Sequence, residues 1–124
     1  MGLLIFCHVF ALQVICTQAQ DDSVLNGDWI RPDGGYLLRV SHAGEDGSVE
    51  AAYFNPNPIH VSEASVSTWK DLKKLFVKLQ GKGYPGSTYT LYYFEEKDAL
   101  AGFYFQAHTG QTFEVVFVRR QSMK

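Results

Sequence analysis

Residues 87–120 of this 124-residue chain read STYTLYYFEEKDALAGFYFQAHTGQTFEVVFVRR. Aromatic, β-branched and other apolar residues fill three short runs, and only a few turn residues separate them. The runs cover residues 87–95, 100–107 and 112–120, with turns at 96–98 and 108–110. Runs of this composition, bounded by turn residues, predict consecutive antiparallel strands. The stretch therefore predicts a β-meander.

The same pattern continues toward the N-terminus. Five more runs are predicted as strands, at residues 24–31, 36–41, 49–54, 59–69 and 73–80. Asp46-Gly47 lies between two of them, and Asp-Gly is a strong hairpin signal. Residues 67–79 also fit a helical spacing, but Leu75, Val77 and Leu79 alternate, which favours a strand pair. About eight sequential strands with short links favour a closed up-and-down barrel over a two-sheet sandwich, which needs long cross-connections.

The N-terminal segment predicts export. Residues 1–19 contain no Asp, Glu, Lys or Arg. Their apolar run, residues 3–15, is shorter than the roughly 20 residues that span a bilayer, and Thr17-Gln18-Ala19 follows it. We expect a cleaved signal peptide at 1–19, one β-barrel domain at 20–124, a periplasmic or extracellular location, and no stable membrane insertion after cleavage. An uncleaved anchor and a buried first helix are the alternatives.

Composition narrows the chemistry of the mature chain. Cys7 and Cys16 both lie in the expected signal peptide, so a disulfide framework and a thiol nucleophile are excluded after cleavage. Net charge is −2 with both signs interspersed, which gives no basic stripe for nucleic acid. The histidines are scattered, whereas a zinc site needs three or four converging ligands. We therefore expect no catalytic residues, no metal site, no cofactor and no enzymatic activity.

Two short motifs at opposite ends of the predicted meander carry a family resemblance. Gly27-Asp28-Trp29 lies on the first run and Arg119-Arg120 on the last. The pattern resembles the calycins, the superfamily of lipocalins, fatty-acid-binding proteins and avidins. In calycins a Gly-x-Trp on the first strand lies across a basic residue of the last strand and closes one barrel end. The resemblance implies that Trp29 and Arg119 close this barrel.

Residues 26–53 are most similar to avidins. Tyr53 falls where avidins place a tyrosine that helps to hold the ureido oxygen of biotin. Avidins wall that pocket with several tryptophans, whereas the mature chain has only Trp29 and Trp69, and Arg31 and Gly35 replace an asparagine and a serine. The resemblance therefore implies the fold and not biotin binding. Residues 55–59, 84–87 and 111–113 are also similar to a group of small secreted bacterial proteins, a likeness that implies no function.

Alternation along the strands predicts which side chains face the barrel interior. If Arg119 reaches Trp29, the face that it shares points inward. Alternation leaves open which face of residues 87–95 and 100–107 points inward, and we expect the tyrosine-bearing faces to do so, because amphipathic tyrosines are the usual lining of a small ligand pocket. The ligand-lining residues predicted this way are Tyr53, Asn55, Ser87, Tyr89, Tyr93, Tyr104 and Gln106. Loops at 55–58 and 81–86 are expected to rim the mouth. The alternative is that the tyrosines fill the barrel.

The opposite face of the last three strands is also apolar. It carries Tyr92, Phe94, Phe103, Phe105, Val116 and Val118. Apolarity on both faces of an antiparallel sheet predicts an interface, here between copies in a homo-oligomer.

The tyrosine-bearing interior predicts a module that binds a small, partly apolar ligand at its open end. The alternative is a protein-interaction module, an envelope adaptor or a protein similar to protease inhibitors, with a solid interior.

Overall fold

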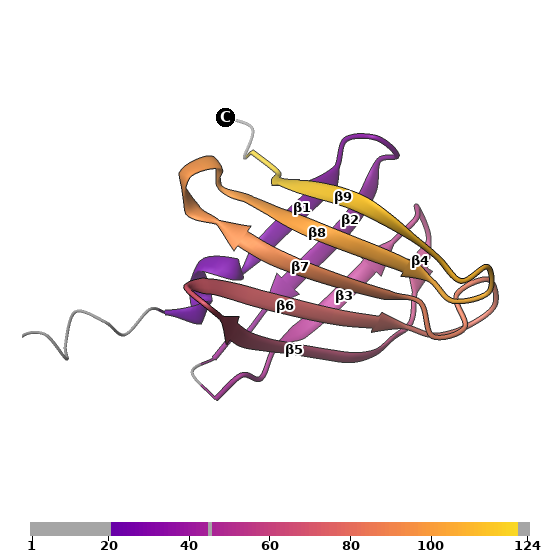
Figure 1. Ribbon diagram of the computed structural model, residues 1–124, viewed down its shortest axis with the longest axis horizontal. Helices are drawn as coiled ribbons and strands as arrows, with labels where there is room; N and C mark the ends of the chain where they lie inside the picture. Colours follow the sequence, from indigo (N-terminus) through magenta and orange to yellow (C-terminus); the bar gives the residue numbers. More distant parts are fainter. Residues whose placement is uncertain (1–20, 45, 122–124) are drawn as a thin grey trace, which may run out of the picture.

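The computed structural model describes residues 21–44 and 46–121, and within them the fold is all-β (Figure 1). Nine strands form one antiparallel sheet with the order β4-β3-β2-β1-β9-β8-β7-β6-β5. The strands are β1 Gly27–Arg31, β2 Tyr36–Ser41, β3 Glu50–Phe54, β4 Pro58–Ile59, β5 Val61–Trp69, β6 Leu72–Leu79, β7 Thr88–Phe94, β8 Ala99–Gln106 and β9 Gln111–Arg119. β1 and β9 pair through Trp29 and Arg119, so the first and last long strands meet. The meander thus curls into a nearly closed barrel, and the predicted fold class is confirmed.

The barrel keeps one seam, between β3 and β5. These strands are neighbours, but no ladder joins them. A backbone hydrogen bond of 3.0 Å from Val66 N to the Gly47 carbonyl bridges the gap. The seam arises because the predicted run at 59–69 is divided. Pro58 and Ile59 fold back onto β3, whereas Val61–Trp69 pairs with β6, so this run supplies both outer strands of the sheet.

The predicted strand at residues 24–31 begins later than expected. Asp22–Leu25 forms a 3₁₀ turn (η1) before β1 starts at Gly27. The side chain of Asp21 accepts a hydrogen bond of 3.0 Å from Ser23 N, which caps the turn. Leu25 is completely buried, because the turn lays its side chain across the barrel end. Local capping and this burial outweigh the strand pattern here.

Trp29 and Arg119 lie at that same end. The guanidinium carbon of Arg119 is 4.3 Å from the Trp29 ring centroid, and Trp29 Nε1 donates to the Leu25 carbonyl at 2.9 Å. Arg119 also donates to the Asn26 and Val24 carbonyls, at 2.8 Å each. This end is therefore closed by a stacked cation and its hydrogen bonds.

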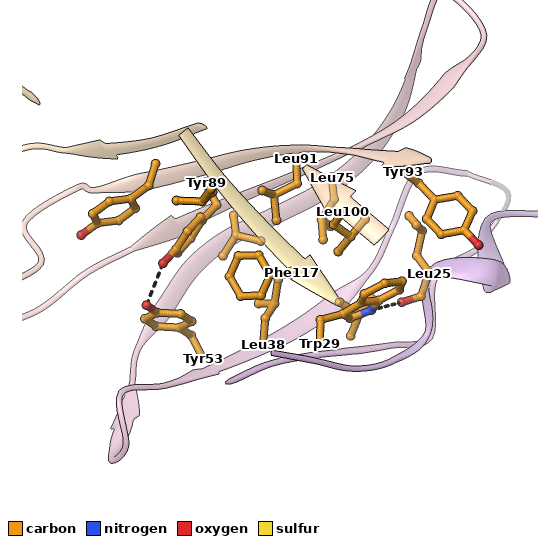
Figure 2. Packing of buried hydrophobic residues seen from close by; sticks show 14 of the residues in the cluster. Leu25, Trp29, Leu38, Tyr53, Leu75, Tyr89, Leu91, Tyr93, Leu100 and Phe117 are labelled. Carbon is orange, nitrogen blue, oxygen red and sulfur yellow. Dashed lines mark hydrogen bonds between the residues drawn. The ribbon is translucent and has the colours of Figure 1, made fainter. Parts of the chain in front are cut away.

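A packed core fills the barrel above this closed end. Side chains from both halves of the sheet meet there with no exposed surface, and Figure 2 shows them between Trp29 at one end and Tyr53 with Tyr89 at the other. The fully buried apolar residues include Leu38, Leu75, Leu91, Leu100 and Phe117. Tyr53 and Tyr89, at the far end of this core, also line the open cavity described below.

The expected signal peptide at 1–19, with Cys7 and Cys16, lies outside the described residues. Within residues 21–44 and 46–121, no helix is both long and apolar enough to cross a membrane.

Candidate functional site

An open cavity of about 280 Å³ lies at the barrel end remote from Trp29. Strand ends and two loops converge around it, and five of its lining side chains are tyrosines. The lining consists of Arg31, Tyr36, Tyr53, Asn55, Gly83, Tyr84, Tyr89, Tyr104 and Gln106. Strand pairing holds part of this set together, because Arg31 pairs with Tyr36 and Tyr89 pairs with Tyr104. The lining is aromatic, with polar groups at its surface.

A short hydrogen-bonded chain crosses the cavity floor. Arg31 Nη1 donates to the Tyr89 hydroxyl at 2.9 Å. The Tyr89 and Tyr53 hydroxyls share a hydrogen bond of 2.8 Å, which Figure 2 shows as a dashed line. The two hydroxyl groups carry two protons, and the bond between them uses one. Whichever of the two donates, the other proton remains for a further acceptor. The floor therefore offers one phenol donor, polarised by the guanidinium behind it.

Both phenols stay protonated at neutral pH. Burial raises the pKa of Tyr53 and of Tyr89 above the usual value, because the interior disfavours a phenolate. The rings contact each other with centroids 5.4 Å apart, and Tyr104 lies 4.7 Å from Tyr89 on its other side. Packing therefore fixes the donor in place, which lowers the entropy cost of binding.

The charge of Arg31 is balanced at the rim. Its side chain is only 13% exposed, and Nη2 lies 2.8 Å from Asp33 Oδ2 in the turn that follows β1. The guanidinium carbon is 4.4 Å from the Tyr36 ring centroid. Asp33 takes two of the guanidinium's donors, through Nε and Nη2, and Tyr89 takes one. The ion pair leaves the cavity with polar donors and little net charge.

The two rim loops add further polar groups. The Asn55 amide donates to the Tyr84 hydroxyl, which joins the loop after β3 to the loop after β6. Since Tyr84 accepts this bond, its own proton can be donated to a ligand. At the end of β8, Gln106 Oε1 accepts from Thr109 Oγ1 at 2.9 Å, so its amide nitrogen is the group left for the cavity. The Tyr84 hydroxyl and the Gln106 amide thus add donors around the mouth.

Five of the seven residues predicted to line a ligand site line the cavity: Tyr53, Asn55, Tyr89, Tyr104 and Gln106. Ser87 does not, because it is fully buried and its hydroxyl accepts from Ala107 N at 3.0 Å. Tyr93 does not either, because it lies at the closed end, where its hydroxyl donates to Asp98 and its ring packs 6.1 Å from Trp29. The expected convergence is wrong for these two residues.

The list of predicted lining residues omits Arg31, Tyr36, Gly83 and Tyr84, although the last two lie in the loop at 81–86 that was expected to rim the mouth. For Arg31 a signal existed, because it stands two residues after the inward-facing Trp29 and so shares its face. Tyr36 follows from Arg31, since the two are paired across the tight turn. Gly83 and Tyr84 come from an irregular loop, where alternation gives no direction.

The outer apolar face of the last strands is exposed as a patch. Tyr92 is half-buried against Trp69, with ring centroids 5.3 Å apart. The other predicted interface residues are each at least 40% exposed: Phe94, Phe103, Phe105, Val116 and Val118.

Comparison of the chain with protein-family models, with curated proteins and with solved structures finds no match. Across the described residues, no group of three or more His, Cys, Asp or Glu side chains is placed to hold a metal ion. The cavity is therefore interpreted from its own geometry.

Proposed function

We propose that this protein is an exported, calycin-like barrel that binds one small molecule in the tyrosine-lined cavity. The observation that carries the proposal is the Arg31–Tyr89–Tyr53 chain, which presents a fixed phenol donor at the floor of an aromatic cup. A cavity of about 280 Å³ holds a small compound, near the lower limit of usual ligand sites.

The donor pattern selects the ligand's chemistry. Phenol and amide protons around the cavity call for a carbonyl, amide or ureido oxygen as their acceptor. The tyrosine rings favour a flat apolar or aromatic body through stacking and edge contacts. A free cation is disfavoured, because Arg31 lies at the floor, and a strong anion meets a guanidinium already paired with Asp33. The best ligand is thus neutral, with an oxygen acceptor at one end.

A titration with defined probes tests this proposal. Benzamide carries an aryl ring and an amide oxygen, toluene lacks the acceptor, and benzylammonium replaces it with a cation. Two-dimensional NMR of the full chain should show benzamide shifting signals of the cavity residues, with much weaker effects of the two controls. In the matched variant Tyr53→Phe/Tyr89→Phe, benzamide affinity should fall at least tenfold while the fold is retained. Equal response to all three probes would contradict the proposed selectivity.

A second candidate function is supported by the packed interior below the cavity. A barrel filled to this depth can also serve as a rigid support for its rim loops in contact with a protein partner. The same NMR titration distinguishes the two functions. If the rim loops bind only a protein partner, benzamide should not shift the signals of the cavity residues.

The proposed export has its own test. N-terminal sequencing of the protein recovered outside the cytoplasm should begin at Gln20, directly after Ala19. Recovery of the full-length chain from the cytoplasm would contradict both the cleavage and the export.

A further inference from the structure

The outward side chains of β6, β7, β8 and β9 form one continuous surface, here called the outer face. Strand register arranges it in four rows across the strands. Read from β6 to β9, the first three rows are Lys78-Thr88-Phe105-Thr112, Phe76-Thr90-Phe103-Glu114 and Lys74-Tyr92-Ala101-Val116, and the fourth row, read from β7 to β9, is Phe94-Ala99-Val118. A shallow groove of about 440 Å³ lies on it, bordered by Phe94, Phe103 and Glu114.

Large and small side chains alternate between the two central strands. In each row, β7 and β8 contribute one bulky and one small residue. The pairs are Thr88 with Phe105, Thr90 with Phe103, Tyr92 with Ala101, and Phe94 with Ala99. A partner surface that exchanges β7 with β8 would therefore set each large side chain over a small one. Another copy of the chain can provide that surface through a two-fold axis.

Two orientations of the two-fold axis place large side chains over small ones, and only the first of them exchanges β7 with β8. An axis along the strands, between β7 and β8, keeps the rows level and places β6 of one copy over β9 of the other. An axis across the strands reverses the rows and places β9 over β9; it also sets Phe103 over Ala101. Because both arrangements match large against small, size alone does not choose between them.

The charges on the outer face choose between them. Across the described residues of these four strands, the outward charged side chains are Glu114 on β9 and Lys74 and Lys78 on β6. Glu114 lies in the row of Phe76, midway between the rows of the two lysines. The axis along the strands brings each Glu114 over Phe76 of the other copy, between its two lysines. The axis across the strands sets Glu114 over Val116, where an apolar contact would desolvate the carboxylate without compensation.

We propose that the outer face binds a second copy of this chain in a two-fold dimer whose axis runs along the strands between β7 and β8. Aligned sheet packing, with strand directions within about 30°, preserves this correspondence of rows. Two symmetric clusters, each of one Glu114 and two lysines, then border an apolar centre. The cavity opens at the barrel end and is not part of this face, so the dimer forms independently of ligand binding.

Charge exchange between copies tests the proposal. Sedimentation equilibrium of the full mature chain should give a dimer for the wild type. Glu114→Lys alone creates three facing cations, and Lys74→Glu/Lys78→Glu alone creates three facing anions, so each variant should dissociate at least tenfold more readily. An equimolar mixture restores both clusters, and native mass spectrometry should show the mixed dimer as the main species. The control Lys82→Glu, in the exposed loop after β6, should leave the dimer unchanged.

Three results would overturn the proposal. They are a monomeric wild type, a Glu114→Lys variant that dimerises like the wild type, or a mixture that stays monomeric while both variants retain the wild-type circular dichroism spectrum. The last result would show that the two variants fold but that the charge pairing of the proposed orientation does not direct their association.

Discussion

The guanidinium of Arg119 stacks on Trp29 at 4.3 Å, and Gly27 makes room for it. A Cβ on Gly27 would lie 2.7 Å from Arg119 Nη1, and the backbone φ of +139° is one that side-chain-bearing residues rarely adopt. The glycine and the tryptophan of the Gly-x-Trp motif therefore serve the same arginine. One gives it space and the other gives it a π-face.

Gly27→Ala should destabilise the barrel by about 2–4 kcal/mol, because backbone strain and displacement of Arg119 add together. Gly110→Ala is the matched control, since φ is +76° there and a Cβ meets no other atom within 4 Å. The Gly110→Ala control should lower the free energy of unfolding by about 1–2 kcal/mol, from backbone strain alone. Urea unfolding measures both values, and equal losses would show that the contact with Arg119 contributes nothing.

Asp98 should make stability depend on acid pH. Hydrogen bonds from Arg119 hold the pKa of Asp98 below its usual value. A lowered folded pKa stabilises the protein fully above the unfolded pKa of about 3.9, and that stabilisation is lost as pH falls through the folded pKa. Asp98→Asn, which tolerates the left-handed backbone at φ +49°, should be less stable than wild type at pH 7.

The difference between wild type and Asp98→Asn should shrink below about pH 4, because the wild type then loses the same ion pair. Urea unfolding at pH 7, 5 and 3 measures this trend. Asp71→Asn, in the exposed β5–β6 turn, is the control, and it should change stability little at any pH. A difference that stays constant from pH 7 down to pH 3 would argue against a role for the Asp98 carboxylate charge.

The ion pair of Lys73 and Asp22 should be costly to break singly. Nζ and Oδ1 lie 2.6 Å apart, with the side chains 11% and 9% exposed. Lys73→Met leaves a buried carboxylate without its partner and should cost about 3–5 kcal/mol. Adding Asp22→Leu should recover much of that loss, since an apolar pair of similar size fits the site. Additive losses in the double-mutant cycle would contradict this expectation.

Tyr89 should matter more to stability than Tyr53. Tyr89→Phe removes the acceptor of the Arg31 guanidinium and also the bond to Tyr53, which leaves a nearly buried donor unpaired. We expect about 1–3 kcal/mol of destabilisation for Tyr89→Phe and roughly 1 kcal/mol for Tyr53→Phe, which loses one neutral bond. Thermal unfolding of the two variants measures the order, and a reversed order would contradict the role of the Tyr89 hydroxyl as the shared partner of Arg31 and Tyr53.

The sequence could predict the barrel, and the tyrosine-bearing faces chosen for residues 87–95 and 100–107 do point inward, but it could not predict the height of a side chain along the barrel axis. Tyr89 and Tyr93 share a strand and a face, yet four residues separate them by about 13 Å, so one lines the cavity and the other the closed end. The alternation of side chains along β1 does predict that Arg31 points inward. Alternation predicts no side-chain direction for Tyr84, because Tyr84 lies in a loop and its position depends on the contact with Asn55.

Native mass spectrometry of the protein, purified under non-denaturing conditions from the cells that make it, tests the proposed binding function most directly. We expect a bound neutral small molecule that organic solvent releases and that is missing from Tyr53→Phe/Tyr89→Phe purified in the same way. A wild-type protein that carries no such molecule and whose cavity also fails to bind benzamide would contradict it.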